Sequence, residues 1–349
     1  MCQYSSEDGF ANDWHLVNVG SFARGGAALV VMEAAGVEAR GRITPNCLGI
    51  WKDQHVDGLS RIVTFMKSQG AVPGIQLAHA GRKGSTHPPF VGRSSIPESE
   101  GGWQTIAPSA IPFDDKYIAK VPKEATVEDI KQINSAFVSA ALRALKAGFQ
   151  VIELHFAHGY LISTFLSPVT NKRSDEYGGS LENRMRFGLE ITESVRKALP
   201  EDIVLGVKVS VSDYADNGWD VKQSVEFAKR LKALGVDYIT SSSGGVVSGV
   251  DYKISPEIQL NGSEQFVKEV GITAGAVGNI TNPQMAESIL QQNKASLIFI
   301  ARAFLNEPHW PYRAADALAD GQAFQYPKQY NWCIGGEKWR KDVFAKQNP

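Results

Sequence analysis

Residues 151–160 read Val-Ile-Glu-Leu-His-Phe-Ala-His-Gly-Tyr and give the clearest indication of how this chain folds. The apolar beginning predicts a buried strand over 151–155, and polar side chains follow it at once. His155 ends the predicted strand, and His158 and Tyr160 stand in the loop behind it. Reactive side chains at the carboxyl end of a buried strand are typical of parallel sheets whose site lies along one rim.

The same arrangement repeats on both sides of this stretch. Strands are predicted at residues 28–33, 72–77, 151–155, 204–209, 237–240, 272–277 and 296–300. Amphipathic spacing and helix-boundary residues predict helices at 53–69, 126–147, 181–198, 221–234, 263–270, 283–291 and 311–318. Thr126 and Asp129 fit a capping box, and Gly148 fits the end of that helix. Strict alternation of strand and helix predicts a parallel sheet covered by helices.

Two parallel architectures fit this alternation, an open doubly wound sheet and a (β/α)₈ TIM barrel. The dinucleotide fingerprint G-x-G-x-x-G is absent after the first predicted strand. Polar or glycine residues end nearly every strand, namely Glu33, Gln76, His155, Ser210, Ser241 to Gly245, Gly275 and Arg302. An open sheet needs such residues only at its switch point, whereas a barrel uses the whole rim. We therefore predict an α/β barrel with its first strand truncated or missing, because only seven strands are found and residues 1–4 offer a stub.

We predict that residues 1–349 form a single domain, since no change in composition divides them. Two segments depart from the alternation. A loop insertion at about 78–122 is rich in glycine, proline and serine, and a C-terminal tail covers about 320–349.

The overall composition excludes several classes of protein. The chain has 36 Lys and Arg against 37 Asp and Glu, so we expect neither a nucleic-acid partner nor membrane binding. Three widely spaced cysteines argue against a disulfide framework and against a metal site of the C-x-x-C type. No apolar run is long enough to span a bilayer, and residues 1–8 lack the pattern of a signal peptide. The cytoplasm is the expected location.

His155, His158 and Tyr160 form the sharpest candidate site. Two imidazoles and a phenol at a barrel mouth can bind a carbonyl oxygen and supply a proton. Two alternatives remain open from these residues alone, namely structural histidines and a metal pair. The H-x-x-H spacing does not match the helical zinc motif, which disfavours the metal.

Further candidates end other strands. Gln76 could pair with the edge of a flat heterocycle, and Lys208 could stabilise negative charge on a reduced cofactor or form an ion pair. Gly275, Gly278 and Ala301–Arg302, which follow the last two strands, resemble the usual phosphate-binding arrangement of barrels.

Longer strings of residues resemble the Old Yellow Enzyme family of flavin-dependent ene-reductases, most closely its thermophilic-like branch. The matching strings include MCQYS at 1–5, GIQLAHAGRK at 74–83, HFAHGYL at 155–161, RSDEYGGS at 173–180 and GAVG at 275–278. They run in order through nearly the whole chain. The resemblance implies a TIM barrel that binds FMN non-covalently and uses NADPH or NADH as hydride donor.

The resemblance also implies roles for single residues. Gln76, Ala34, Met1 and Cys2 would contact the flavin ring, Lys208 would lie near its N1, and Gly275, Ala301 and Arg302 would hold its phosphate. His155 and His158 would bind the substrate's carbonyl oxygen, Tyr160 would donate a proton, and Tyr4 would assist in binding. The implied reaction reduces the activated C=C bond of an α,β-unsaturated carbonyl compound in a ping-pong cycle. The protein could form a homo-oligomer.

Two other functions are compatible with the same residues. The chain could dehydrogenate or isomerise a natural product with the same flavin, or it could be a non-catalytic, truncated barrel. Three departures from the family pattern bear on this choice. The first barrel strand is missing before Met1, Lys208 replaces the usual arginine, and Ala301 replaces a glycine, which is tolerable if its φ is negative.

Overall fold

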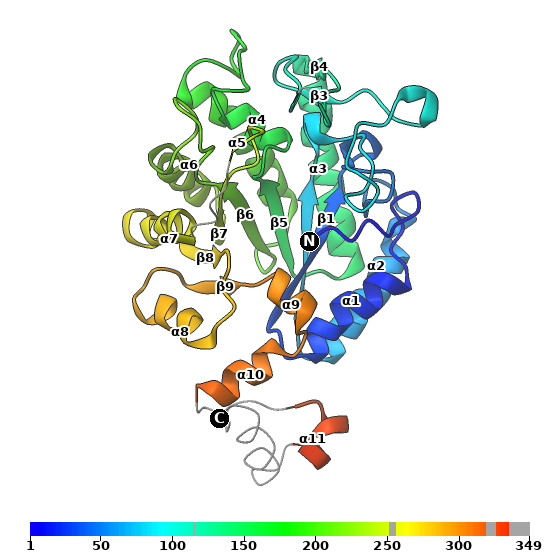
Figure 1. The fold of residues 1–349 in the computed structure, drawn as a ribbon, viewed down its shortest axis with the longest axis vertical. Helices are drawn as coiled ribbons and strands as arrows, with labels where there is room; N and C mark the ends of the chain where they lie inside the picture. The colour runs from blue at the N-terminus through cyan, green and yellow to red at the C-terminus, as the bar shows by residue number, and fades with distance from the viewer. Residues whose placement is uncertain (115, 251–255, 319–325, 335–349) are drawn as a thin grey trace.

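The computed structural model describes residues 1–114, 116–250, 256–318 and 326–334. Seven parallel strands form its central sheet (Figure 1). Their bounds are β1 (Leu29–Gly36), β2 (Val72–Ala78), β5 (Val151–Phe156), β6 (Val204–Ser210), β7 (Tyr238–Ser242), β8 (Thr273–Val277) and β9 (Leu297–Phe299). They pair in the order β1-β2-β5-β6-β7-β8-β9, so each strand lies beside the next strand of the predicted series. All seven predicted strands are confirmed.

The sheet curls as a TIM barrel does, but it does not close. Among the described residues, no strand lies between β9 and β1, and these two edges do not pair with each other. Residues 1–6 contain no strand. Over the described residues the fold is therefore a TIM-barrel-like α/β fold whose sheet is open between β9 and β1.

Helices cover the outside of the sheet (Figure 1). The longer ones are α1 (Asp13–Arg24), α2 (His55–Ser68), α3 (Val127–Ala147), α5 (Leu181–Ala198), α6 (Val221–Ala233), α7 (Pro256–Gln265), α8 (Pro283–Gln291) and α10 (Trp310–Ala317). Short helices follow at α4 (Leu161–Leu166), α9 (Arg302–Asn306) and α11 (Lys328–Ile334). Among the described helices, none is long and apolar enough to cross a membrane.

Two expectations about the helices are corrected. The short helix predicted at 263–270 instead begins at Pro256, as α7, and its last turns form a wider π-helical segment over Phe266–Val270. The sequence reading also missed α1, although its start carries a capping box between Asn12 and His15. Trp14 and Val17 of α1 are exposed, so the apolar face of this helix is poorly separated from its outer face.

Helix α3 shows how local signals and core packing act together. The Thr126 side chain accepts a hydrogen bond from the Asp129 amide and Gly148 ends the helix in a left-handed conformation, so both boundary predictions are confirmed. Ile133 and Phe137 on its inner face are fully buried. The helix thus begins and ends on sequence signals and is held by burial.

The insertion at 78–122 forms irregular structure at one end of the barrel. It contains the two-residue strand β3 (Ile106–Ala107), which pairs with β4 (Lys123–Glu124), near the top of Figure 1. The Lys120 ammonium ties the segment together by donating to the carbonyls of Ile96 and Trp103 at 2.8 and 3.0 Å. Of the predicted tail at 320–349, only residues 326–334 lie within the described part of the chain.

Replacing Ile133 by alanine tests the contribution of α3 to the core. We expect Ile133→Ala to lower the free energy of unfolding by about 2–5 kcal/mol, because a buried side chain is lost and a cavity remains. Leu142→Ala on the same helix is the control, since Leu142 is 45% exposed, and should change it by less than about 0.5 kcal/mol. Equal decreases in the free energy of unfolding of the two variants, measured with urea, would contradict this account of the core.

Candidate active site

A cavity of about 560 Å³ lies at the carboxyl end of the sheet, and two of the candidate residues line it. Tyr160 from the loop after β5 and Tyr4 from the N-terminal segment both line it. The insertion supplies most of the remaining wall, including Lys83, Arg93 and Phe113. A cavity of this size is in the range that binds small organic ligands.

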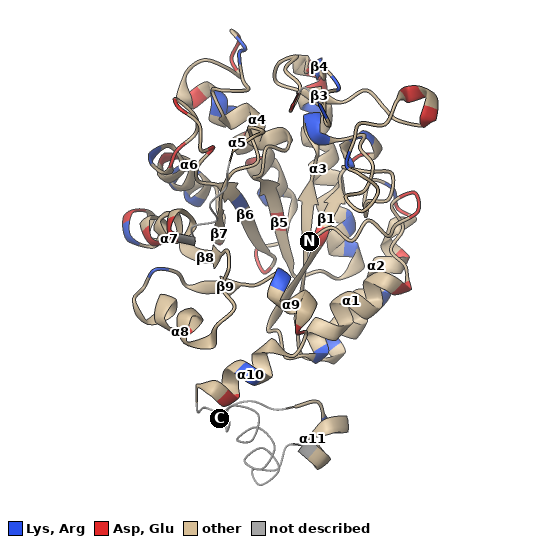
Figure 2. Cartoon of the chain, in the orientation of Figure 1, with Lys and Arg blue, Asp and Glu red and all other residues tan. Residues whose placement is uncertain are grey.

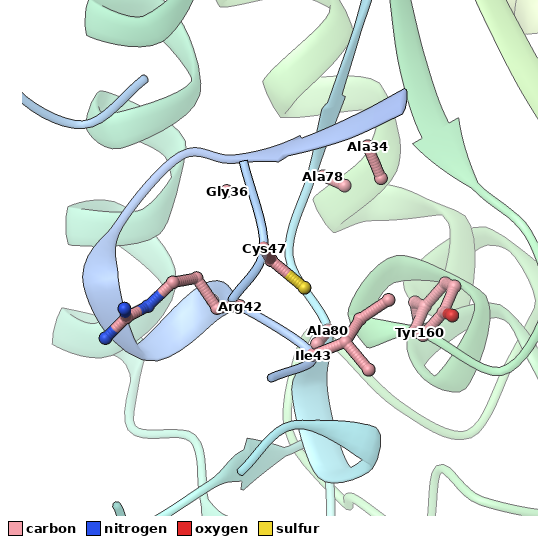
Figure 3. Close-up of a pocket in the computed structure, with 9 residues that line it drawn as sticks. Ala34, Gly36, Arg42, Ile43, Cys47, Ala78, Ala80 and Tyr160 are labelled. Carbon is pink, nitrogen blue, oxygen red and sulfur yellow. The ribbon is translucent and has the colours of Figure 1, made fainter. Parts of the chain in front are cut away.

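A second, much narrower hollow adjoins Tyr160 (Figure 3). Ala34 on β1, Ala78 at the end of β2 and Cys47 line it, and the Cys47 sulfur points into it. Burial raises the pKa of the Cys47 thiol, which keeps it protonated. Cys47 and Tyr160 thus line the same hollow.

His155 and His158 lie against each other in a chain of hydrogen bonds. The Ala157 amide donates to His155 Nδ1 at 3.2 Å, which leaves the proton of this imidazole on Nε2. His155 Nε2 lies 3.2 Å from His158 Nδ1, and His158 Nε2 lies 2.7 Å from the Ser242 hydroxyl. Both Nε2 atoms therefore carry donor hydrogens. Among the described residues, no third His, Cys, Asp or Glu joins the pair to form a metal-binding group.

The surroundings hold both imidazoles in the neutral form. Burial lowers the pKa of His155 to about 3, with further contributions from the charges of Lys208 and Lys83. Burial also places the pKa of His158 well below its ordinary value, and the same two lysines act in that direction. The pair can therefore donate N–H groups at neutral pH without carrying a positive charge.

Tyr160 packs edge-on against His155, with the ring centroids 5.1 Å apart. Burial raises the pKa of Tyr160 well above that of a free phenol. The phenol therefore stays protonated and can supply a proton to a group that develops strong basicity. Among the described side chains, the nearest cation over its ring is Lys83, whose Nζ lies 5.1 Å from the ring centroid.

Lys83 connects the two loops that form the site. Its ammonium donates to the carbonyl oxygens of His158 at 2.9 Å and Gly245 at 3.1 Å. Burial, followed by the charges of Arg82 and Arg93, lowers the pKa of Lys83 to about 7. In the sequence, Lys83 stands only within the string at 74–83, and no local pattern there indicates these contacts.

The backbones of these loops approach so closely that glycine is required. A Cβ on Gly159 would lie 1.9 Å from the Gly245 carbonyl oxygen, and both glycines have positive φ. His158 itself adopts the left-handed conformation at φ 62°, which costs roughly 1–2 kcal/mol for a residue with a side chain. The Ser210 hydroxyl, which accepts from the His158 amide at 2.8 Å, helps to hold this conformation.

Gln76 lies on β2, and the nitrogen of its side-chain amide already makes a hydrogen bond. Its Nε2 donates to the buried carboxylate of Glu153 at 2.6 Å, and Thr240 donates to the same carboxylate at 2.9 Å. Among the described residues, none donates to the Gln76 carbonyl oxygen. Glu153 thus orients Gln76 and leaves that oxygen free to accept.

Lys208 lies on β6 beside His155 in the sheet register. It is half-buried, and among the described residues it has neither a hydrogen-bond partner nor an ion-pair partner. The ion pair that was open as an alternative reading is therefore absent from this part of the chain. An unpaired cation at the barrel rim is suited to a ligand that carries or gains negative charge.

The candidate phosphate residues are only partly as predicted. Gly275 lies inside β8 rather than after it, and a Cβ there would lie 2.6 Å from the Phe299 ring, so its small size serves packing. Ala301 has φ −115°, as the prediction required, and Arg302 donates to Asn279 at 2.9 Å in the loop after β8. The rim beside β8 is therefore formed by Asn279 and Arg302.

The N-terminal segment is fixed to β1 at the rim. The Gln3 amide donates to a Glu33 carboxyl oxygen at 2.9 Å, and the Ser6 amide donates to the Asn46 carbonyl at 2.9 Å. Cys2 is half-buried, and burial raises the pKa of its thiol. Met1 is 58% exposed. These contacts bring Tyr4 to the cavity wall.

The carboxyl rim of this parallel barrel carries neutral imidazoles, a protonated phenol and a cation without a partner in the described residues. Such groups are typical of a barrel enzyme that transfers protons and stabilises developing charge. Comparison with known families identifies which one. The family described as NADH:flavin oxidoreductase / NADH oxidase matches residues 1–321, and the chain belongs to it. It is therefore an oxidoreductase, and its resemblance to the Old Yellow Enzymes is confirmed.

Individual relatives agree with this assignment. The chain is 47% identical over 320 residues to an NADPH dehydrogenase of Geobacillus sp. strain WCH70, covering 91% of this chain and 88% of the relative. It is 44% identical over 320 residues to an NADPH dehydrogenase of Bacillus subtilis strain 168, covering 91% and 89%. A solved structure of morphinone reductase matches with a TM-score of 0.75 at 24% identity, over 91% of this chain and 84% of that one, which supports the fold.

Glu33 provides a test of how the rim is held. Burial raises the pKa of Glu33 from 4.5 to about 7, so between these values the folded protein keeps a proton that the unfolded chain releases. Stability contributed by this carboxyl is therefore lost as the pH rises through that window. Glu33→Gln keeps an acceptor for Gln3 and cannot ionise. We measure the free energy of unfolding in urea for Glu33→Gln and for the unmodified protein. We expect the variant's value minus that of the unmodified protein to increase as the pH rises from about 5 to 8.

The exposed Glu98→Gln variant controls for the loss of one carboxylate. A relative stability of Glu33→Gln that is flat with pH would show that Glu33 is not held protonated by its burial.

Proposed function

We propose that this protein is an FMN-dependent NADPH oxidoreductase that reduces the activated C=C bond of α,β-unsaturated carbonyl compounds. The observation that carries the proposal is the trio of His155, His158 and Tyr160, whose neutral donors and protonated phenol share one rim. The names of the relatives support NADPH as hydride donor. A carbonyl oxygen that gains charge during reduction is the acceptor such donors suit.

Two side chains on the rim are chemically suited to a planar, electron-accepting ring. Lys208 is an unpaired cation, and the carbonyl oxygen of Gln76 is free to accept from a ring N–H. Ala34 presents no bulky side chain in the narrow hollow of Figure 3. In this proposal these residues, with Met1 and Cys2 beside them, hold the ring, and Gly275, Ala301 and Arg302 hold the phosphate. Bound there, FMN would supply hydride transfer between the nicotinamide and the substrate.

His155 and His158 bind the substrate's carbonyl oxygen through their Nε2 hydrogens. These hydrogens now face His158 Nδ1 and the Ser242 hydroxyl, at 3.2 and 2.7 Å, so a substrate oxygen has to replace these acceptors. Because both rings are neutral, the donors gain most when charge develops on the oxygen. The imidazoles therefore favour the enolate-like transition state over the ground state.

Tyr160 supplies the proton to the substrate carbon. Its raised pKa keeps the phenol protonated, and an enolate-like carbon is basic enough to take this proton. The vacated phenolate lies beside the Lys83 ammonium, whose charge stabilises it until solvent returns the proton.

The proposed reaction is tested on the purified protein with FMN added. We expect it to bind FMN, to lose its flavin absorbance when NADPH is added without oxygen, and to regain it when cyclohexenone is added. Binding of FMN without reoxidation by any enone would favour a different flavin reaction. Failure to bind FMN would favour the non-catalytic barrel.

Tyr160→Phe tests the assignment of the proton donor. We expect this variant to slow reoxidation by the enone by about 10²–10⁴-fold, the range of a general acid, while reduction by NADPH changes little. Stopped-flow absorbance measures the two half-reactions separately. Tyr177→Phe, at a buried tyrosine that bonds Glu190, is the control. Equal slowing of both half-reactions by Tyr160→Phe would remove Tyr160 from this role.

A further inference from the structure

We propose that the 560 Å³ cavity binds its ligand through an anionic group, a carboxylate or phosphate, held between Lys83 and Arg93. This inference rests on the proposed function and names the chemical class of ligand at the same site.

The described lining of the cavity is rich in cations. Lys83, Arg93 and Lys116 contribute three positively charged side chains, and among the described lining residues Asp114 is the single carboxylate. Elsewhere the two signs are mixed, as on α5 and α6 in Figure 2. The cavity wall therefore differs from the outer helices in its balance of charge.

Asp114 is already engaged by its own loop. Its Oδ1 accepts hydrogen bonds from the backbone amides of Lys116, Tyr117 and Ile118, at 2.9, 2.6 and 2.9 Å. This arrangement closes a tight turn in the insertion. Asp114 accordingly forms no ion pair with Arg93, Lys83 or Lys116 among the described contacts.

Arg93 is exposed and has no hydrogen-bond or ion-pair partner among the described residues. Its charge nevertheless acts on groups of the cavity. Burial raises the pKa of both Tyr4 and Tyr160, and the charge of Arg93 opposes that rise in each. A guanidinium that lines the cavity and acts on both tyrosines is well placed to meet a ligand there.

Lys83 supplies the buried half of the site. Its ammonium has three N–H donors, of which two are used on the carbonyls of His158 and Gly245. Arg93 lies near enough for its charge to disfavour protonation of Lys83. Two cations that repel each other across a cavity are both stabilised by an anion between them. An organic anion therefore completes this wall.

Such an anion can come from either reactant. A carboxylate could belong to the unsaturated carbonyl substrate, and a phosphate could belong to NADPH. The two sources act in different half-reactions, so separate measurements distinguish them. The insertion would then set selectivity while the strand-end residues perform the chemistry.

Arg93→Gln tests the proposal by calorimetry and stopped flow on the FMN-loaded protein. The unreactive ligands 4-oxopentanoate and its methyl ester form one matched pair, and NADP⁺ and NAD⁺ form the other. If the substrate is the source, Arg93→Gln weakens 4-oxopentanoate binding about ten-fold and leaves the ester unchanged. If the dinucleotide is the source, Arg93→Gln removes a preference of similar size for binding NADP⁺ over NAD⁺. The variant then also loses the preference for NADPH over NADH in flavin reduction.

Arg93→Lys should restore part of the preference, because it keeps the charge and loses the fork of donors. Arg61→Gln, at an exposed arginine that pairs with Asp13, controls for the loss of one positive charge. The proposal is overturned if Arg93→Gln changes neither preference, or if the unmodified protein shows neither. The binding measurements need no turnover, so a failure of the proposed reaction would be recognised separately, as flavin that no enone reoxidises.

Discussion

The contact between the loop after β5 and the loop after β7 is the constraint on which the site depends. Gly159 and Gly245 bring the two backbones together without side chains between them, and the Lys83 ammonium binds a carbonyl from each loop. This contact fixes His158 in its left-handed conformation and places its imidazole against His155 and Ser242. The geometry of the donors is thus set by backbone packing.

Burial then decides the chemical state of the groups that the contact brings together. Removal from water disfavours the charged form of an imidazole, a phenol and an amine alike. His155 is neutral, Tyr160 is protonated, and the pKa of Lys83 falls to about 7. Lys208 remains without a partner in the described part of the chain. The described rim therefore offers hydrogen-bond donors at His155, His158, Tyr160 and Lys208, which suit developing negative charge.

Much of this could be predicted from sequence because the strands are short, apolar and separated by well-marked helices. The strand at 151–155 and the polar residues behind it were sufficient to place His155, His158 and Tyr160 at one rim. Contacts between distant segments could not be predicted in this way. Ser242, Lys83 and Cys47 enter the site through tertiary packing, and no local pattern distinguishes them. The contact of Gly275 with Phe299 could not be predicted either, because it depends on the neighbouring strand.

The unpaired edges of β1 and β9 have a mechanical consequence. Elsewhere the barrel wall is joined by ladders of backbone hydrogen bonds, whereas this seam is bridged by helices. Tyr312 of α10 donates to the Arg24 carbonyl at 2.6 Å, and the rings of Phe22 and Phe304 lie 5.8 Å apart. In the described part of the chain, resistance to splaying at this seam therefore rests on contacts between helices rather than on a strand ladder.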